Sequence, residues 1–168
     1  GKMIVMQFRR FLYAFLCLLP LAAGLSPAAA QQDGGRKRQQ KASLLYLEGV
    51  KRQNLGTLRE AARLYEAAIR QVPEHAAAYY RLSGIARMID DPAASLRYAR
   101  RAYELDTACR DYADNYARML TVTGDYKAAD SLFSMLLERD PSDFETMSLL
   151  ALLKLETGLP AEALALID

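Results

Sequence analysis

From residue 42 onward, apolar residues recur every three or four positions, which is the spacing of one face of an α-helix. A polar turn over residues 54–57 ends the first of these stretches, and a second amphipathic stretch runs from Leu58 to Ile69 and closes before Pro73. The pattern therefore predicts two helices joined by a short turn over residues 42–75.

This pattern of helix, turn and helix returns at an interval of 34 residues. Turn-forming residues mark the interval at Gly56, Asp90, Gly124 and Gly158. A fixed period of this size indicates stacked copies of one supersecondary unit. The units predicted are 42–75, 76–109, 110–143 and an incomplete 144–168, without β-strands and with helix ends near residues 55, 71, 89, 105, 123, 139 and 157.

Small residues also follow the period, and their places suggest close contacts between helices. One set falls on the first helix of each unit, at Gly49, Ser83, Ala117 and Ala151, and a matching set falls on the second helix, at Ala61, Ser95, Ala129 and Ala163. Larger side chains at a close helix crossing would force the helices apart. We therefore expect the two helices of each unit to cross at these positions.

The units resemble the tetratricopeptide repeat. The third unit carries the resemblance most clearly, with Tyr116, Ala117, Gly124, Ala129, Phe133 and Pro141, and the first carries it with Leu45, Gly49, Gly56, Ala61, Tyr65, Ala68 and Pro73. The second departs from it, with Thr107 in place of the proline. The resemblance implies an all-α, right-handed superhelical solenoid of antiparallel helix pairs, with about 3.5 to 4 units over residues 42–168.

The same resemblance implies a function in binding a protein or peptide on a concave surface lined by the first helix of each unit. Tyrosine and arginine are enriched where such contacts contribute most to affinity. Tyr46 and Tyr80 are expected side by side, with acidic ligand groups toward the groove arginines. The candidate partner-binding residues are Tyr46, Gln53, Tyr80, Arg87, Asp114 and Arg118.

Residues suited to catalysis or metal binding are few. His75 is the only histidine, so a metal site of ordinary composition lacks its ligands, and no glycine-rich phosphate loop occurs. The basic run at 36–41 has no aromatic neighbours and is interpreted as solvated rather than as a nucleic-acid site. The sequence predicts no enzyme activity, no cofactor, no metal and no nucleic-acid partner.

The first thirty residues have the pattern of a secretory signal peptide: basic residues before an apolar run, and small residues at Ala28 and Ala30. Cleavage is expected before Gln31, followed by a disordered basic leader over 31–41 that contains no apolar side chain. The protein is therefore expected to be exported, to the periplasm of a bacterium. The alternative is a membrane anchor over residues 11–30, which would be the only membrane contact.

Charge divides the rest of the chain into two halves of opposite sign. Residues 31–110 carry 15 basic and 9 acidic side chains, whereas residues 111–168 carry 4 and 11. This asymmetry leaves open a structural subunit that assembles head to tail, and a second alternative is a helper domain of a larger envelope complex. Cys109 is the only cysteine after residue 30, so the sequence predicts no disulfide within the mature chain.

Overall fold

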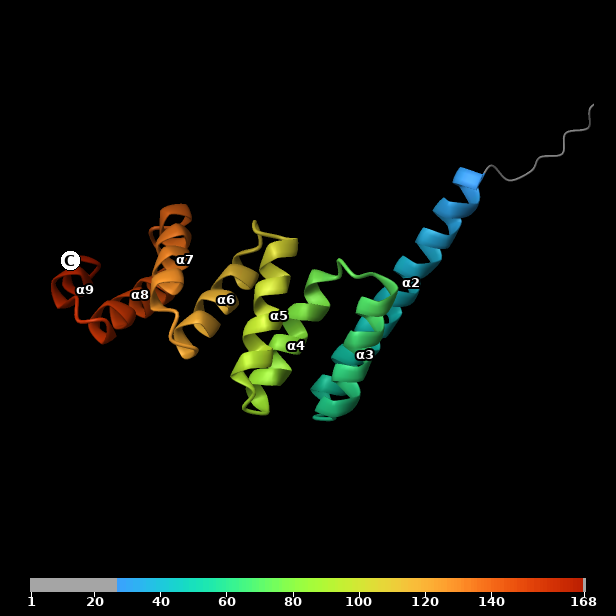
Figure 1. The fold of residues 1–168 in the computed structure, drawn as a ribbon, viewed down its shortest axis with the longest axis horizontal. Helices are drawn as coiled ribbons and strands as arrows, with labels where there is room; N and C mark the ends of the chain where they lie inside the picture. Colours follow the sequence, from blue (N-terminus) through green and yellow to red (C-terminus); the bar gives the residue numbers. More distant parts are fainter. Residues whose placement is uncertain (1–26, 168) are drawn as a thin grey trace, which may run out of the picture. The chain divides into compact units, whose positions relative to one another are not determined.

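The computed structural model describes residues 27–167, and within this range residues 38–167 belong to one compact unit. All regular structure within the described range is helical (Figure 1). The helices are α2 (Pro27–Asn54), α3 (Leu58–Gln71), α4 (Ala76–Met88), α5 (Pro92–Leu105), α6 (Arg110–Val122), α7 (Tyr126–Arg139), α8 (Phe144–Glu156) and α9 (Pro160–Ala165). Each helix from α3 to α8 packs against the next along the chain, which confirms the predicted helical repeat solenoid.

The turn inside each pair depends on one residue with a positive φ angle. Gly56, Asp90, Gly124 and Gly158 have φ values of 76°, 61°, 83° and 79°. Asp90 is the only one of them with a side chain, and aspartate tolerates this left-handed conformation better than most residues. The 34-residue period in the sequence is thus a period in backbone conformation.

Helix starts are also repeated features. The second helices α5 and α7 begin after Asp91 and Asp125, whose side chains accept hydrogen bonds from the backbone N–H groups of Ala94 and Ala128. The first helix α8 begins in the same way after Asp143. Such caps satisfy donors that have no partner inside the helix.

The small residues lie where the paired helices meet. Ala61, Ala117 and Ala129 are fully buried, and the Oγ atoms of Ser83 and Ser95 are 3.0 Å apart. In the first pair the close contact is between Gly49 and the ring of Tyr65, because a methyl group added at Gly49 would lie 2.7 Å from a ring carbon. The predicted close approach of paired helices is confirmed at these contacts.

The predicted leader differs from the structure, which continues α2 through residues 31–41. Arginine, lysine and glutamine favour helix, and Lys37 forms an ion pair with Asp33 one turn earlier at 2.7 Å. The absence of apolar side chains removes a reason to pack but does not prevent a helix.

Most of the predicted signal peptide, residues 1–26, lies outside the described residues. Within residues 27–167, no helix has both the length and the hydropathy of a membrane-spanning segment.

Candidate functional site

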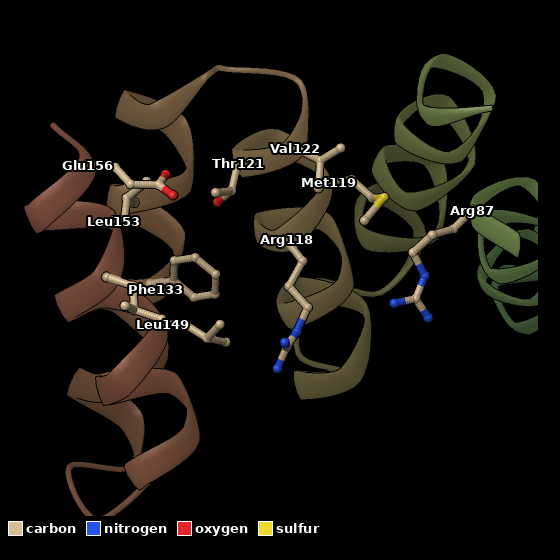
Figure 2. A pocket seen from close by; sticks show the side chains of 10 residues that line it. Arg87, Arg118, Met119, Thr121, Val122, Phe133, Leu149, Leu153 and Glu156 are labelled. Carbon is tan, nitrogen blue, oxygen red and sulfur yellow. The ribbon is translucent and has the colours of Figure 1, made fainter. Parts of the chain in front are cut away.

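The first helices of successive pairs line a groove made of two pockets. The N-terminal pocket has a volume of about 170 Å³, and the C-terminal pocket has a volume of about 340 Å³ (Figure 2). Arg87 lines both, so the two pockets adjoin, and we refer to them together as the groove. The N-terminal pocket is lined by Gln53, Tyr80, Arg81, Gly84, Arg87, Met88 and Asn115.

The C-terminal pocket is mainly apolar. Figure 2 shows its side chains converging from α6, α7 and α8, with Arg87 of α4 on one side and Glu156 on the opposite side. It is lined by Arg87, Arg118, Met119, Thr121, Val122, Phe133, Leu149, Leu152, Leu153 and Glu156. Leu152 is 58% exposed, so an incoming ligand would cover apolar surface that water now contacts.

Hydrogen bonds fix the floor of the N-terminal pocket. Asn115 Nδ2 donates to Ser83 Oγ at 2.9 Å. The Ser95 hydroxyl donates to the Ser83 carbonyl oxygen at 2.9 Å and also lies 2.9 Å from Met119 Sδ. These contacts join α4, α5 and α6, so the floor under the groove is a shared polar network rather than a set of separate helix surfaces.

The two candidate tyrosines have different surroundings. The Tyr46 ring packs against the rings of Tyr65 and His75 at centroid distances of 5.6 and 5.1 Å. Tyr80 packs instead against Tyr112, at 5.3 Å. Within the described residues the rings of Tyr46 and Tyr80 thus pack in two separate aromatic clusters rather than on each other. Of the two tyrosines, Tyr80 lines the N-terminal pocket.

Gln53 is held in the groove by a buried tyrosine. Its Oε1 atom accepts a hydrogen bond of 2.7 Å from the hydroxyl of Tyr65. Burial raises the pKa of Tyr65 to about 12, so this hydroxyl stays protonated and remains a donor at neutral pH. Gln53 also lines the N-terminal pocket.

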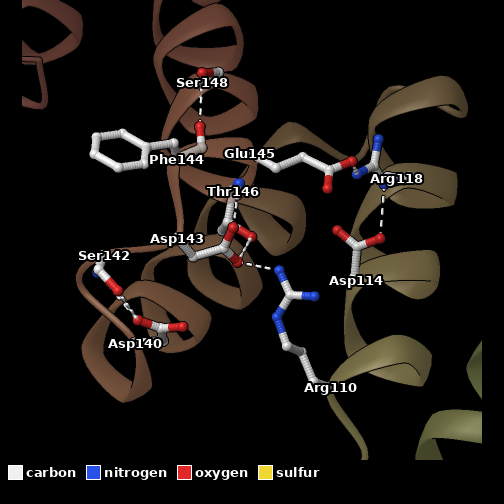
Figure 3. A network of polar contacts seen from close by, with 10 residues as sticks. All are labelled: Arg110, Asp114, Arg118, Asp140, Ser142, Asp143, Phe144, Glu145, Thr146 and Ser148. Carbon is white, nitrogen blue, oxygen red and sulfur yellow. Dashed lines mark hydrogen bonds and ion pairs between the residues drawn. The ribbon is translucent and has the colours of Figure 1, made fainter.

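Asp114 and Arg118 are brought together, but as an ion pair rather than as two separate contacts for a ligand. Arg118 Nε lies 2.7 Å from Asp114 Oδ2, and a second guanidinium nitrogen lies 2.6 Å from Glu145 Oε1 (Figure 3). Two carboxylates thus neutralise the charge of Arg118. The expected role of this arginine in attracting acidic ligand groups is weakened accordingly.

Arg81 and Arg87 are the groove cations that keep their charge available. Neither forms an ion pair with a carboxylate in the part of the chain that the structure describes. Arg81 Nε donates to the hydroxyl of Tyr46 at 3.4 Å, and this contact raises the pKa of Arg81 above its usual value. Both guanidinium groups line the N-terminal pocket.

Sequence reasoning missed three groove residues that share one position of the repeat. Arg81, Asn115 and Leu149 follow one another at 34-residue intervals and line the two pockets. The signal was present in the period, because Arg81 and Asn115 directly follow the groove candidates Tyr80 and Asp114. Which of two neighbouring positions faces the groove depends on how each helix is rotated about its axis, and the spacing in the sequence does not determine that rotation.

The described residues hold no group of three or more histidine, cysteine, aspartate or glutamate side chains placed to bind a metal ion. The arrangement has the shape and the polar contacts of a binding surface. It presents Arg81 and Arg87 in the N-terminal pocket, and mainly apolar side chains with one acidic residue, Glu156, in the C-terminal pocket.

Comparison with known proteins identifies the repeat. Residues 46–113 match the family model of the tetratricopeptide repeat. No curated protein matches the sequence. Residues 46–113 of the chain are therefore tetratricopeptide repeats.

Several solved structures share the fold. A crystal structure of the MamA protein has a TM-score of 0.69 and 19% identity, with 83% of this chain and 73% of that chain covered. YrrB, described as a TPR protein with an unusual peptide-binding site, has a TM-score of 0.69 and 23% identity, with 76% of this chain and 66% of that chain covered. The first TPR of Spaghetti (RPAP3), bound to the HSP90 peptide SRMEEVD, has a TM-score of 0.66 and 18% identity, with 71% of this chain and 95% of that chain covered.

Proposed function

We propose that this chain binds a peptide, or an extended segment of another protein, in the groove formed by the first helices of its repeats. The observation that carries the proposal is that two adjoining pockets lie along the first helices, with Arg87 lining both. The two similar structures described with a peptide or a peptide-binding site support the same class of ligand. The groove supplies contacts for binding, and we assign the chain no catalytic role.

Affinity capture tests this proposal. The chain purified from its host would be isolated with its bound material, and the recovered proteins identified by mass spectrometry. We expect a recovered partner to be lost with Tyr80→Ala, because this variant removes an aromatic ring from the N-terminal pocket. Retention of every partner by Tyr80→Ala would contradict binding in the groove.

We further propose that the protein works in the bacterial envelope after export. The support comes from the sequence, in which small residues at Ala28 and Ala30 follow an apolar run. Mass spectrometry of the protein from its host tests this. A mature N-terminus at Gln31 in the periplasmic fraction is expected, whereas an intact N-terminus in the membrane fraction would favour an anchor.

A second candidate function is a self-assembling scaffold. The opposite charges of residues 31–110 and 111–168 favour contact between unlike halves of neighbouring copies. Sedimentation at low and high salt separates this candidate from peptide binding. Self-association that weakens with salt and is unchanged in Tyr80→Ala, with no partner recovered, would favour the scaffold.

A further inference from the structure

We infer that the ligand of the groove is a peptide segment with an acidic side chain beside a large apolar side chain, and with no acidic residue on the far side of the apolar one. The inference rests on the proposed function and adds the chemistry of the ligand. It follows from how charge and apolar surface are distributed along the two pockets.

The acidic side chain is assigned to the N-terminal pocket. Arg81 and Arg87 both line it, and neither has a carboxylate partner within residues 31–167. Asn115, held by its bond to Ser83, adds an amide that is already oriented. Guanidinium groups bind carboxylates with paired, charge-assisted hydrogen bonds. These residues therefore leave charged donors free to bind an anionic side chain of the ligand.

The apolar side chain is assigned to the C-terminal pocket. Its volume of about 340 Å³ is large enough for a leucine, methionine or phenylalanine side chain. Leu149, Leu152, Val122 and Phe133 supply apolar side chains to its lining. Because Arg87 borders both pockets, the acidic and apolar side chains of the ligand must lie within a few residues of each other.

The far end of the groove disfavours a second acid. Glu156 lies across the C-terminal pocket from Arg87 (Figure 2). Arg118, the other cation lining this pocket, is already paired with Asp114 and Glu145. A carboxylate beyond the apolar side chain would therefore meet like charge, whereas a neutral or basic residue would not. The groove thus has a polarity, and a ligand should bind it in one direction.

Selection from a phage-displayed random peptide library on the full chain tests the inference. Enriched peptides are expected to share an acidic residue within a few positions of an aliphatic or aromatic one, with acids depleted beyond it. The double variant Arg81→Glu and Arg87→Glu should weaken binding of an enriched peptide by about tenfold or more and shift selection toward basic residues.

A matched control changes the same charge elsewhere. Arg63 and Arg70 are exposed on α3 and line neither pocket, so Arg63→Glu with Arg70→Glu should leave selection unchanged. Circular dichroism checks that both double variants remain helical.

Three results would overturn the inference. Enrichment of peptides without acidic residues, still lost in Tyr80→Ala, would overturn the ligand chemistry and leave peptide binding intact. Equal weakening by the control pair would show a general charge effect. Enrichment of no peptide at all would contradict the proposed function itself.

Discussion

The hydroxyl oxygens of Ser83 and Ser95 lie 3.0 Å apart at the buried crossing of α4 and α5. The corresponding positions in the third pair are Ala117 and Ala129, which are fully buried. The second pair therefore uses a polar contact where the third uses an apolar one. Asn115 also donates to Ser83, so this polar contact supports the floor of the groove.

Replacing Ser83 and Ser95 together should destabilise the protein by less than the sum of the two single replacements. Ser83→Ala leaves the Asn115 amide without its acceptor, and Ser95→Ala removes the donor to the Ser83 carbonyl. Each should lower the free energy of unfolding by about 1 to 2 kcal/mol, because the polar group that loses its partner stays buried, where water cannot replace the hydrogen bond. The double variant should cost less than the sum, as measured by urea unfolding. Costs that add within about 0.5 kcal/mol would show that the two hydroxyls act independently.

Two glycines on first helices should respond in opposite ways to alanine. Gly49→Ala places a methyl group against the ring of Tyr65, which is fully buried and tied to Gln53. We expect a loss of about 1 to 3 kcal/mol from overpacking. Gly84 has no heavy atom within 4 Å of the added methyl, so Gly84→Ala should gain about 0.5 to 1 kcal/mol from helix propensity. Thermal unfolding measures both, and stabilisation by Gly49→Ala would contradict the close crossing.

His75 should make stability depend on pH near neutrality. Its Nδ1 atom accepts from the backbone N–H of Ala78 at the start of α4, and burial lowers the pKa of His75 below its ordinary value of 6.5. The folded state therefore favours the neutral ring, and stability present above about pH 6.5 is lost as the pH falls toward the lower folded pKa. The loss should be up to about 1 kcal/mol, the usual contribution of a cap.

The variant His75→Asn keeps a capping side chain that does not titrate. Urea unfolding between about pH 7.5 and 5 should show a smaller decline for the variant than for the wild type. Equal declines would assign the pH dependence to other groups.

Asp143 should contribute both a cap and a charge at the start of α8. Its carboxylate accepts from the backbone and hydroxyl groups of Thr146 at 3.2 and 2.6 Å and pairs with Arg110 (Figure 3). The hydroxyl of Thr146 and the guanidinium of Arg110 lower the pKa of Asp143 to about 2. Asp143→Ala should cost about 1 to 2 kcal/mol, and Asp143→Asn should cost less because it keeps an oxygen for the cap.

Because Asp143 is charged, its contribution to stability should depend on pH. Because its pKa is lowered on folding, the stability it adds is present above the ordinary value of 3.8 and is lost as the pH falls from there toward 2. The advantage of the wild type over Asp143→Asn should therefore shrink over this range. An advantage that does not change with pH would show that the pair with Arg110 contributes nothing.

The sequence predicted the repeat closely, because its signals are local. Expected helix ends at 55, 71 and 89 compare with observed last residues Asn54, Gln71 and Met88. The turn glycines and Asp90 determine where the paired helices stop, and capping aspartates determine where several helices begin.

The groove was harder to predict, because its chemistry depends on which side chains pair. Spacing placed Arg118 and Asp114 correctly on first helices but could not show that they neutralise each other. It also could not show that Tyr80 packs on Tyr112 while Tyr46 packs on Tyr65. These choices depend on side-chain directions across different helices, which a one-dimensional pattern does not contain.

Nuclear magnetic resonance mapping tests the central claim most directly. The labelled chain would be titrated with a peptide enriched on it, and backbone amide shifts followed. The account predicts shift changes concentrated on α4, α6 and α8, including residues around Tyr80, Arg87 and Leu149 that line the two pockets. Changes confined to α3, α5 and α7, with these groove residues unaffected, would contradict it.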